Sequence, residues 1–269
     1  MTTSSNRLVI SILAVVLWLA VTMGLALLQV AEGTSLGQLV SRQIVWGPPA
    51  AAALLLVIIG VMKWTDVGFN AVRPASSWRL IWFPMLIIAG FFAAAIFLHP
   101  PIPAAVLLTV TINTMIVGFS EELAFRGVLW GAARKALPFW GAFFLVTFLF
   151  GIVHVLNALL TGQFASAGVQ AFNAMLSGSA FLALRIRTHA LLPVMIVHWL
   201  WDLSVFLLLS GPASTEPAAA PLEQLLGALI IVGPMALYGF YLIRNATVRA
   251  GWQDDHAPSP AFFAPRKGE

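Results

Sequence analysis

Cysteine is absent from this 269-residue chain, and charged residues make up only 9% of it. The lack of cysteine excludes disulfide bonds and thiolate metal sites. The lack of charge says more, because soluble proteins carry about 25% charged and roughly 45–50% apolar residues, whereas 60% of this chain is hydrophobic. So few charges could not cover the surface of a soluble domain. The composition therefore excludes soluble globular and disordered proteins and indicates a membrane protein.

Long polar stretches are equally scarce, and eight apolar runs each approach the length that crosses a bilayer as a helix. The predicted spans lie near 8–30, 45–62, 80–98, 103–125, 139–160, 168–184, 190–209 and 222–243. The runs are continuously apolar rather than alternating, which favours helices over β-barrel strands. We therefore predict an all-α polytopic bundle. Residues 1–249 would form one transmembrane domain, and the polar residues 250–269 a disordered cytoplasmic tail.

The positions of the 14 Lys and Arg residues predict the orientation of the bundle. With a cytoplasmic N-terminus, 12 of them fall on cytoplasmic segments, Arg42 alone lies outside, and Arg126 lies within the membrane. This asymmetry follows the positive-inside rule and places both termini in the cytoplasm. Because topology explains the surplus of basic residues, we expect a lipid bilayer of the bacterial cytoplasmic-membrane type as the surroundings, and no nucleic-acid partner.

Six ionisable residues lie inside the predicted spans, where each charge costs at least about 2.5–3.5 kcal/mol. They are Glu121, Glu122 and Arg126 in the fourth span, His154 in the fifth, and His198 and Asp202 in the seventh. Two pairs are four residues apart and share a helix face. At about 1.5 Å per residue, Glu121, His154 and His198 fall within roughly 8 Å of one another in depth. The pattern predicts one buried polar site shared by three helices.

Water-driven hydrolysis of an amide is the chemistry that suits such a site. A buried carboxylate can take a proton from water near neutral pH. Histidines can orient that water, donate to an oxyanion or protonate a leaving amine. Glu, His and Asp also bind zinc or another divalent metal, for which Glu121, His154 and His198 would be the ligands. Ser120 precedes the acidic pair, but no paired base marks it as a nucleophile.

The three motifs resemble those of the CPBP family, the CAAX-processing and bacteriocin-processing intramembrane endopeptidases. They are Glu-Glu-x-x-x-Arg at 121–126, Phe-x-x-x-His at 150–154 and His-x-x-x-Asp at 198–202. Their order, spacing and distribution over separate helices match the family, and the resemblance covers about 115–205. It implies a membrane-embedded protease, glutamate-dependent or metal-dependent, that acts on a CAAX-type prenylated protein, another membrane protein or a peptide.

The resemblance also implies roles for the matching residues. Glu121 would activate water, Glu122 would assist it and be held by Arg126, and His154 would orient water or substrate. His198 and residue 202 would stabilise the oxyanion, while Phe150 is expected to pack rather than react. Eukaryotic CAAX endopeptidases have Asn at the last position, where this chain has Asp202. Since an ionised Asp cannot donate a hydrogen bond, the role of Asp202 and the need for a metal stay open. We favour the metal-free glutamate mechanism.

Two other classes of protein would also bury such groups. A proton-coupled transporter uses similar relays, but it commonly shows internal repeats, which are absent here. A catalytically silent member of the family would serve as a scaffold or immunity factor. Asn157 in the fifth span and Asn173 in the sixth are expected to form interhelical hydrogen bonds or to line a cavity.

Overall fold

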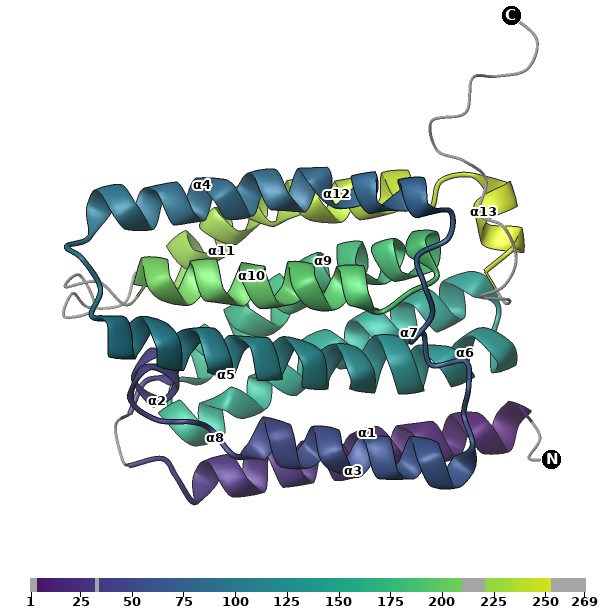
Figure 1. The fold of residues 1–269 in the computed structure, drawn as a ribbon, viewed down its shortest axis with the longest axis horizontal. Coiled ribbons are helices and arrows are strands. Elements are labelled where there is room, and N and C mark those ends of the chain that lie inside the picture. Colours follow the sequence, from purple (N-terminus) through teal and green to yellow (C-terminus); the bar gives the residue numbers. More distant parts are fainter. Residues whose placement is uncertain (1–3, 32–33, 210–220, 253–269) are drawn as a thin grey trace, which may run out of the picture.

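The computed structural model describes residues 4–31, 34–209 and 221–252, and this part of the chain is helical with no strand. Figure 1 shows most of the long helices lying side by side in one bundle. The principal helices are α1 (Ser4–Leu27), α2 (Leu36–Arg42), α3 (Gly47–Met62), α4 (Trp82–Leu98), α5 (Ala104–Glu122), α6 (Trp130–Ala136), α7 (Phe139–Ile152), α8 (Ala158–Thr161), α9 (Phe164–Thr188), α10 (Leu192–Leu209), α11 (Pro221–Ile231), α12 (Gly233–Leu242) and α13 (Ala246–Ala250). The predicted all-α class is confirmed.

Each of the eight predicted runs coincides with a helix, but the helices differ in their capacity to span a membrane. Six helical segments are long and apolar enough to do so. The helices α2 and α3 reach that length only together, with an 81° bend between them, and α10 is a shorter apolar helix. Eight spans therefore remain a prediction. The predicted cytoplasmic tail at 250–269 lies outside the described residues beyond 252.

The fourth span is longer than predicted. Its predicted end lies near residue 125, whereas the helical segment continues from Ala104 to Ala136. It passes from α5 through the π-helical segment η2 (Leu123–Leu129) into α6. The segment runs past Arg126 without a break, and this side chain is fully buried and ion-paired.

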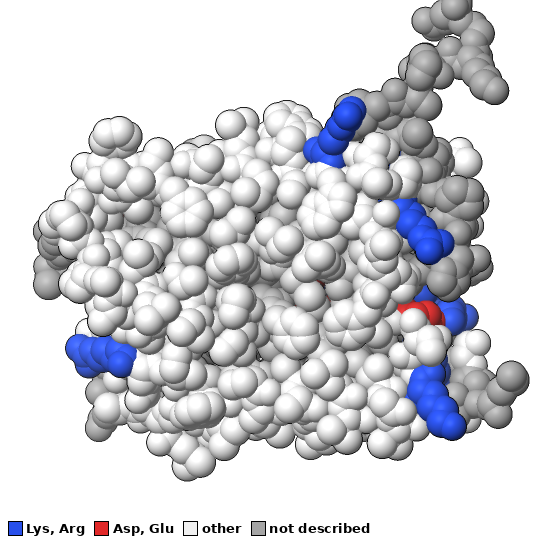
Figure 2. All heavy atoms as spheres, viewed as in Figure 1, with Lys and Arg blue, Asp and Glu red and all other residues white. Residues whose placement is uncertain are grey.

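Basic side chains gather at one end of the bundle, whereas α2, which ends at Arg42, lies at the other end (Figure 1 and Figure 2). At the basic end Asp66 binds both guanidinium nitrogens of Arg7, at 2.6 and 3.0 Å. It also pairs with Lys135 and, at 3.6 Å, with Arg134. Burial alone would raise the pKa of Asp66, but Arg7 and Lys135 hold it well below its usual range. Asp66 thus fastens the start of α1 to the end of α6.

Close contact between α7 and α9 brings two elements of the site together. A Cβ atom at Gly151 would lie 2.8 Å from the carbonyl oxygen of Ala171, and one at Gly178 would lie 2.6 Å from the Phe150 ring. Only glycine allows backbones to approach this far. On α9 the small residues Ala167, Ala171 and Ala174 are buried as well. The approach presses Phe150 and the segment after it against α9.

Candidate active site

The six ionisable residues lie on three parts of the bundle: the junction of α5 with η2, the segment after α7, and α10. Glu121 and Glu122 end α5, and Arg126 lies in the π-helical η2. His154 lies in the 3-10 helix η3 (Val153–Asn157), which follows α7, and α10 carries His198 and Asp202. Short π-helical segments occur frequently at functional sites because the widened turn redirects side chains. The predicted convergence of three helices is what the structure has.

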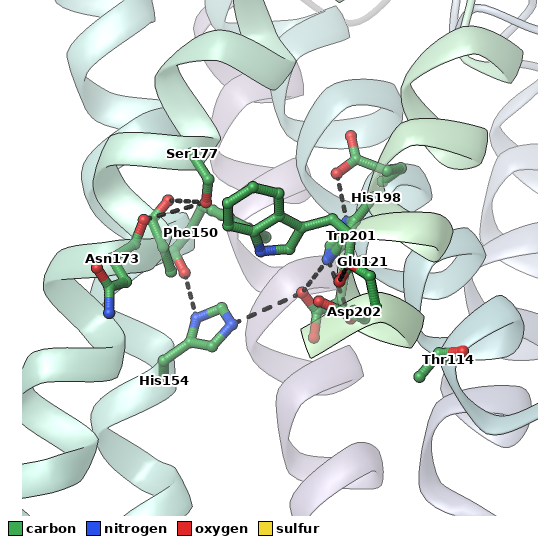
Figure 3. A network of polar contacts seen from close by, with 12 residues as sticks. Thr114, Glu121, Phe150, His154, Asn173, Ser177, His198, Trp201 and Asp202 are labelled. Atoms are coloured by element: carbon green, nitrogen blue, oxygen red, sulfur yellow. Dashed lines mark hydrogen bonds and ion pairs between the residues drawn. The ribbon is translucent and has the colours of Figure 1, made fainter. Parts of the chain in front are cut away.

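Glu121 lies at the meeting point of the two histidines (Figure 3). Its Oε2 atom is 3.8 Å from Nε2 of His154 and 3.8 Å from Nε2 of His198. The side chain of Glu121 is 18% exposed, but Oε2 itself is buried and has no hydrogen-bond partner among the described residues. These separations are too long for a direct hydrogen bond. The carboxylate therefore faces the shared space with a free acceptor.

Glu122 forms a second, fully buried layer behind Glu121. Its Oε1 atom accepts a hydrogen bond of 2.9 Å from Nη1 of Arg126 and lies 2.7 Å from Nδ1 of His198. Arg126 also donates to the carbonyl oxygen of Gly178 at 3.0 Å. Neither side chain of the Glu122–Arg126 pair is exposed. Adjacent glutamates thus have different surroundings: Glu121 borders the open part of the site and Glu122 holds His198 from within.

Hydrogen bonds at the Nδ1 atoms fix the direction of both imidazole rings. Nδ1 of His154 lies 2.8 Å from the carbonyl oxygen of Phe150, which only accepts, so this nitrogen carries the proton. Nδ1 of His198 faces the Glu122 carboxylate in the same way. Each ring therefore turns Nε2 toward Glu121. On the same side, Oδ2 of Asp202 lies 3.4 Å from Nε2 of His198.

Aromatic rings hold the polar groups in place. The Phe150 ring lies 3.9 Å from the Arg126 guanidinium carbon and meets the rings of His154 and His198 edge-on, at 5.1 and 5.8 Å. Phe150 is thus a packing residue at the centre of the site. Phe181 lies 5.0 Å from the His198 ring in a tilted arrangement. The sequence analysis assigns Phe181 no role, because one Phe among many in apolar spans carries no signal.

Ser120 lies outside the reacting groups. Its hydroxyl accepts a 2.8 Å hydrogen bond from the indole of Trp18 and donates at 3.0 Å to the carbonyl oxygen of Pro48. The side chain is fully buried and joins α5 to α1 and α3. Both capacities of the hydroxyl are therefore used in packing.

We expect Ser120→Ala to retain proteolytic activity and to lower stability by about 1–3 kcal/mol, because the substitution leaves the Trp18 indole without its partner. Activity and thermal unfolding of the purified variant test this together. Loss of activity in a variant that melts like the parent would return Ser120 to the candidate nucleophiles.

The donor groups of the site are spaced more widely than the ligands of a tetrahedral zinc ion. Zinc bonds of about 2.0–2.1 Å place such ligands roughly 3.3 Å apart, whereas Glu121 lies 3.8 Å from each histidine. Over the described ranges, no group of three His, Asp or Glu residues is arranged to hold a metal ion. As arranged, Glu121, His154 and His198 do not match this zinc geometry.

The central part of the chain matches a known family. The family model described as Type II CAAX prenyl endopeptidase Rce1-like covers residues 101–204, which contain all six ionisable residues of the site. No curated protein and no solved structure matches the chain. With its long apolar helices, the chain is a multi-pass membrane protein of a protease family. The match over residues 101–204 supports membership of the CPBP family of CAAX-processing and bacteriocin-processing membrane endopeptidases.

Proposed function

We propose that the protein is an intramembrane endopeptidase that hydrolyses a peptide bond with water activated by Glu121. The observation that carries the proposal is the unpartnered Oε2 atom of Glu121, which lies 3.8 Å from the Nε2 atoms of two oriented histidines. A carboxylate beside a site for one water is the arrangement a general base needs. The buried Glu122–Arg126 pair would position His198 rather than react.

In the proposed reaction Glu121 takes one proton from water as the water oxygen attacks the substrate carbonyl carbon. The carbonyl oxygen becomes an oxyanion in the tetrahedral intermediate, and His154 orients the water. Collapse of the intermediate breaks the C–N bond, and the proton held by Glu121 passes to the leaving amine. The products are a carboxylic acid and an amine, and Glu121 returns to its starting state.

Asp202 and His198 would stabilise the oxyanion together. Since Nδ1 of His198 donates to Glu122, a neutral His198 and an ionised Asp202 would face each other with two acceptors across 3.4 Å. One proton shared between Nε2 and Oδ2 removes this repulsion. When the oxyanion forms, the same proton would turn from this bridge to the oxyanion and serve as its hydrogen-bond donor.

We expect Asp202→Asn to keep kcat/KM within about tenfold of the parent, because the Asn side chain supplies a permanent N–H donor. Asp202→Ala should lower kcat by about 10²–10³-fold, as loss of one oxyanion donor does in other hydrolases. Steady-state kinetics on both variants tests the role. Equal losses in the two variants would instead indicate that the charge of Asp202 is required.

The substrate class we propose is a prenylated CAAX-type protein or peptide in a bacterial-type cytoplasmic membrane. The direct test incubates the purified protein with a farnesylated CAAX peptide, with and without a chelator, and identifies the products by mass spectrometry. Cleavage that resists chelation supports the glutamate mechanism, whereas cleavage abolished by chelation and restored by zinc supports a metal. No cleavage of this peptide or of membrane peptides would favour a transporter or a catalytically silent member.

A further inference from the structure

Three carboxamide side chains lie next to His154 in the membrane-spanning part of the protein. Asn157 belongs to the same 3-10 helix as His154, three residues later, so the two side chains lie one above the other. Asn157 donates a 2.9 Å hydrogen bond to Oε1 of Gln170 on α9. Asn173 lies one turn further along α9, on the face that it shares with Gln170. Figure 3 shows Asn173 on the same side of the site as His154.

Asn173 has hydrogen-bonding capacity that the described residues do not use. Its Oδ1 atom is buried without a partner, and its side chain makes no hydrogen bond among the described residues. Asn113 on α5 is the contrasting case of a buried amide whose hydrogen bonds are all made within the protein. Asn113 donates to the carbonyl oxygens of Val40 and Gln43 and accepts from the N–H of Val45. A buried amide oxygen without a hydrogen bond costs free energy, so the Oδ1 atom of Asn173 is available to accept a hydrogen bond from a bound ligand.

The carboxamides border a part of the site that remains accessible. Asn157, Gln170 and Asn173 are all half-buried, and no residue of η3 is buried. The reacting side chains next to them, Glu121 and Asp202, are 18% and 21% exposed. Because His154 stands between Glu121 and this cluster, a chain that reaches Glu121 from this side would pass the carboxamides.

We propose that Asn157, Gln170 and Asn173 bind the main chain of the substrate beside the scissile bond. This inference rests on the proposed function. A peptide bond in an extended segment has free N–H and C=O groups, which inside a membrane cannot turn to bulk water. A carboxamide offers one donor group and one acceptor, which is the complement of a peptide unit. The cluster thus recognises an extended backbone rather than a side chain.

The test measures binding without catalysis. A fluorescent farnesylated CAAX peptide is titrated onto the Glu121→Gln protein in nanodiscs, alongside the same protein carrying Asn173→Leu or Gln170→Leu. We expect either substitution to raise the Kd about five- to tenfold, the worth of one hydrogen bond. Peptides methylated at single backbone nitrogens should show the same loss at one bond in the parent, and a smaller loss in Asn173→Leu.

The matched control is Ser179→Ala on the same helix, whose hydroxyl bonds its own backbone at Leu176. Its Kd should equal that of the parent. Asn173→Leu should melt at or above the parent temperature, because it removes an unpartnered amide, so lost binding could not be ascribed to misfolding. Unchanged Kd values, or no binding by the parent, would overturn the inference. Cleavage by the wild-type protein is scored separately, so failure of the proposed function is distinguishable.

Discussion

Glu121→Gln should abolish measurable proteolysis, with kcat/KM lowered by about 10³-fold or more. General-base catalysis contributes about 10²–10⁴-fold, and the amide of Gln cannot take a proton from water. The substitution keeps the size of the side chain, and Oε2 of Glu121 has no hydrogen-bond partner to lose among the described residues. The variant should therefore insert, fold and melt like the parent while cleaving no peptide, as measured by product formation and thermal unfolding in the same preparation.

Two matched substitutions separate this effect from a general loss of charge. Glu223→Gln changes an exposed residue in the first turn of α11 and should leave both activity and stability unchanged. Glu122→Gln should lower stability as well as activity, because Glu122 binds Arg126 and His198 in the buried layer. If Glu121→Gln retained activity, or if Glu122→Gln lost activity without losing stability, the roles assigned to the two glutamates would be exchanged or wrong.

The existence of the site could be predicted from the sequence because charge is so rare in this chain. Glu121, His154 and His198 stood out against apolar spans, and simple counting along straight helices placed them at similar depth. Counting along straight helices could not show which of Glu121 and Glu122 faces the open part of the site and which is buried behind it. Neighbouring residues point about 100° apart on a helix, and only the positions of Arg126 and Phe150 show which one faces inward.

Hydropathy could not predict the irregular geometry of the helices that carry the site, because it scores each residue without its contacts. A hydropathy scale scores Arg126 as a charge and does not register the bonds to Glu122 and Gly178 that make its burial tolerable. Hydropathy likewise carries no signal for the π-helical η2 or the 3-10 helical η3. The 81° bend between α2 and α3 is a third case, because the apolar run near 45–62 covers α3 and leaves α2 out.

Arg126→Met should produce the largest loss of stability among single substitutions in the site. Removing one partner of a buried ion pair leaves the other charge uncompensated and costs about 3–5 kcal/mol. Here Glu122 would keep only His198, the Gly178 carbonyl would lose its donor, and the cation beside the Phe150 ring would disappear. Thermal unfolding in detergent should show the loss, and Arg42→Met, at an exposed position on α2, should change stability by less than about 0.5 kcal/mol.

The double variant Glu122→Gln/Arg126→Met distinguishes charge from packing in this prediction. Neutral side chains of similar volume can replace a buried ion pair with little cost, and the carboxamide introduced at position 122 would still accept from Nδ1 of His198. We therefore expect the double variant to recover most of the stability that Arg126→Met loses, while Glu121 and the histidines keep a measurable fraction of activity. If the double variant were as unstable as the single one, shape rather than charge would be what Arg126 supplies, through its contact with Phe150. In either outcome the buried charge of Glu122 has a role in the site, because Glu122 contacts Nδ1 of His198 and so turns Nε2 of that ring toward Glu121.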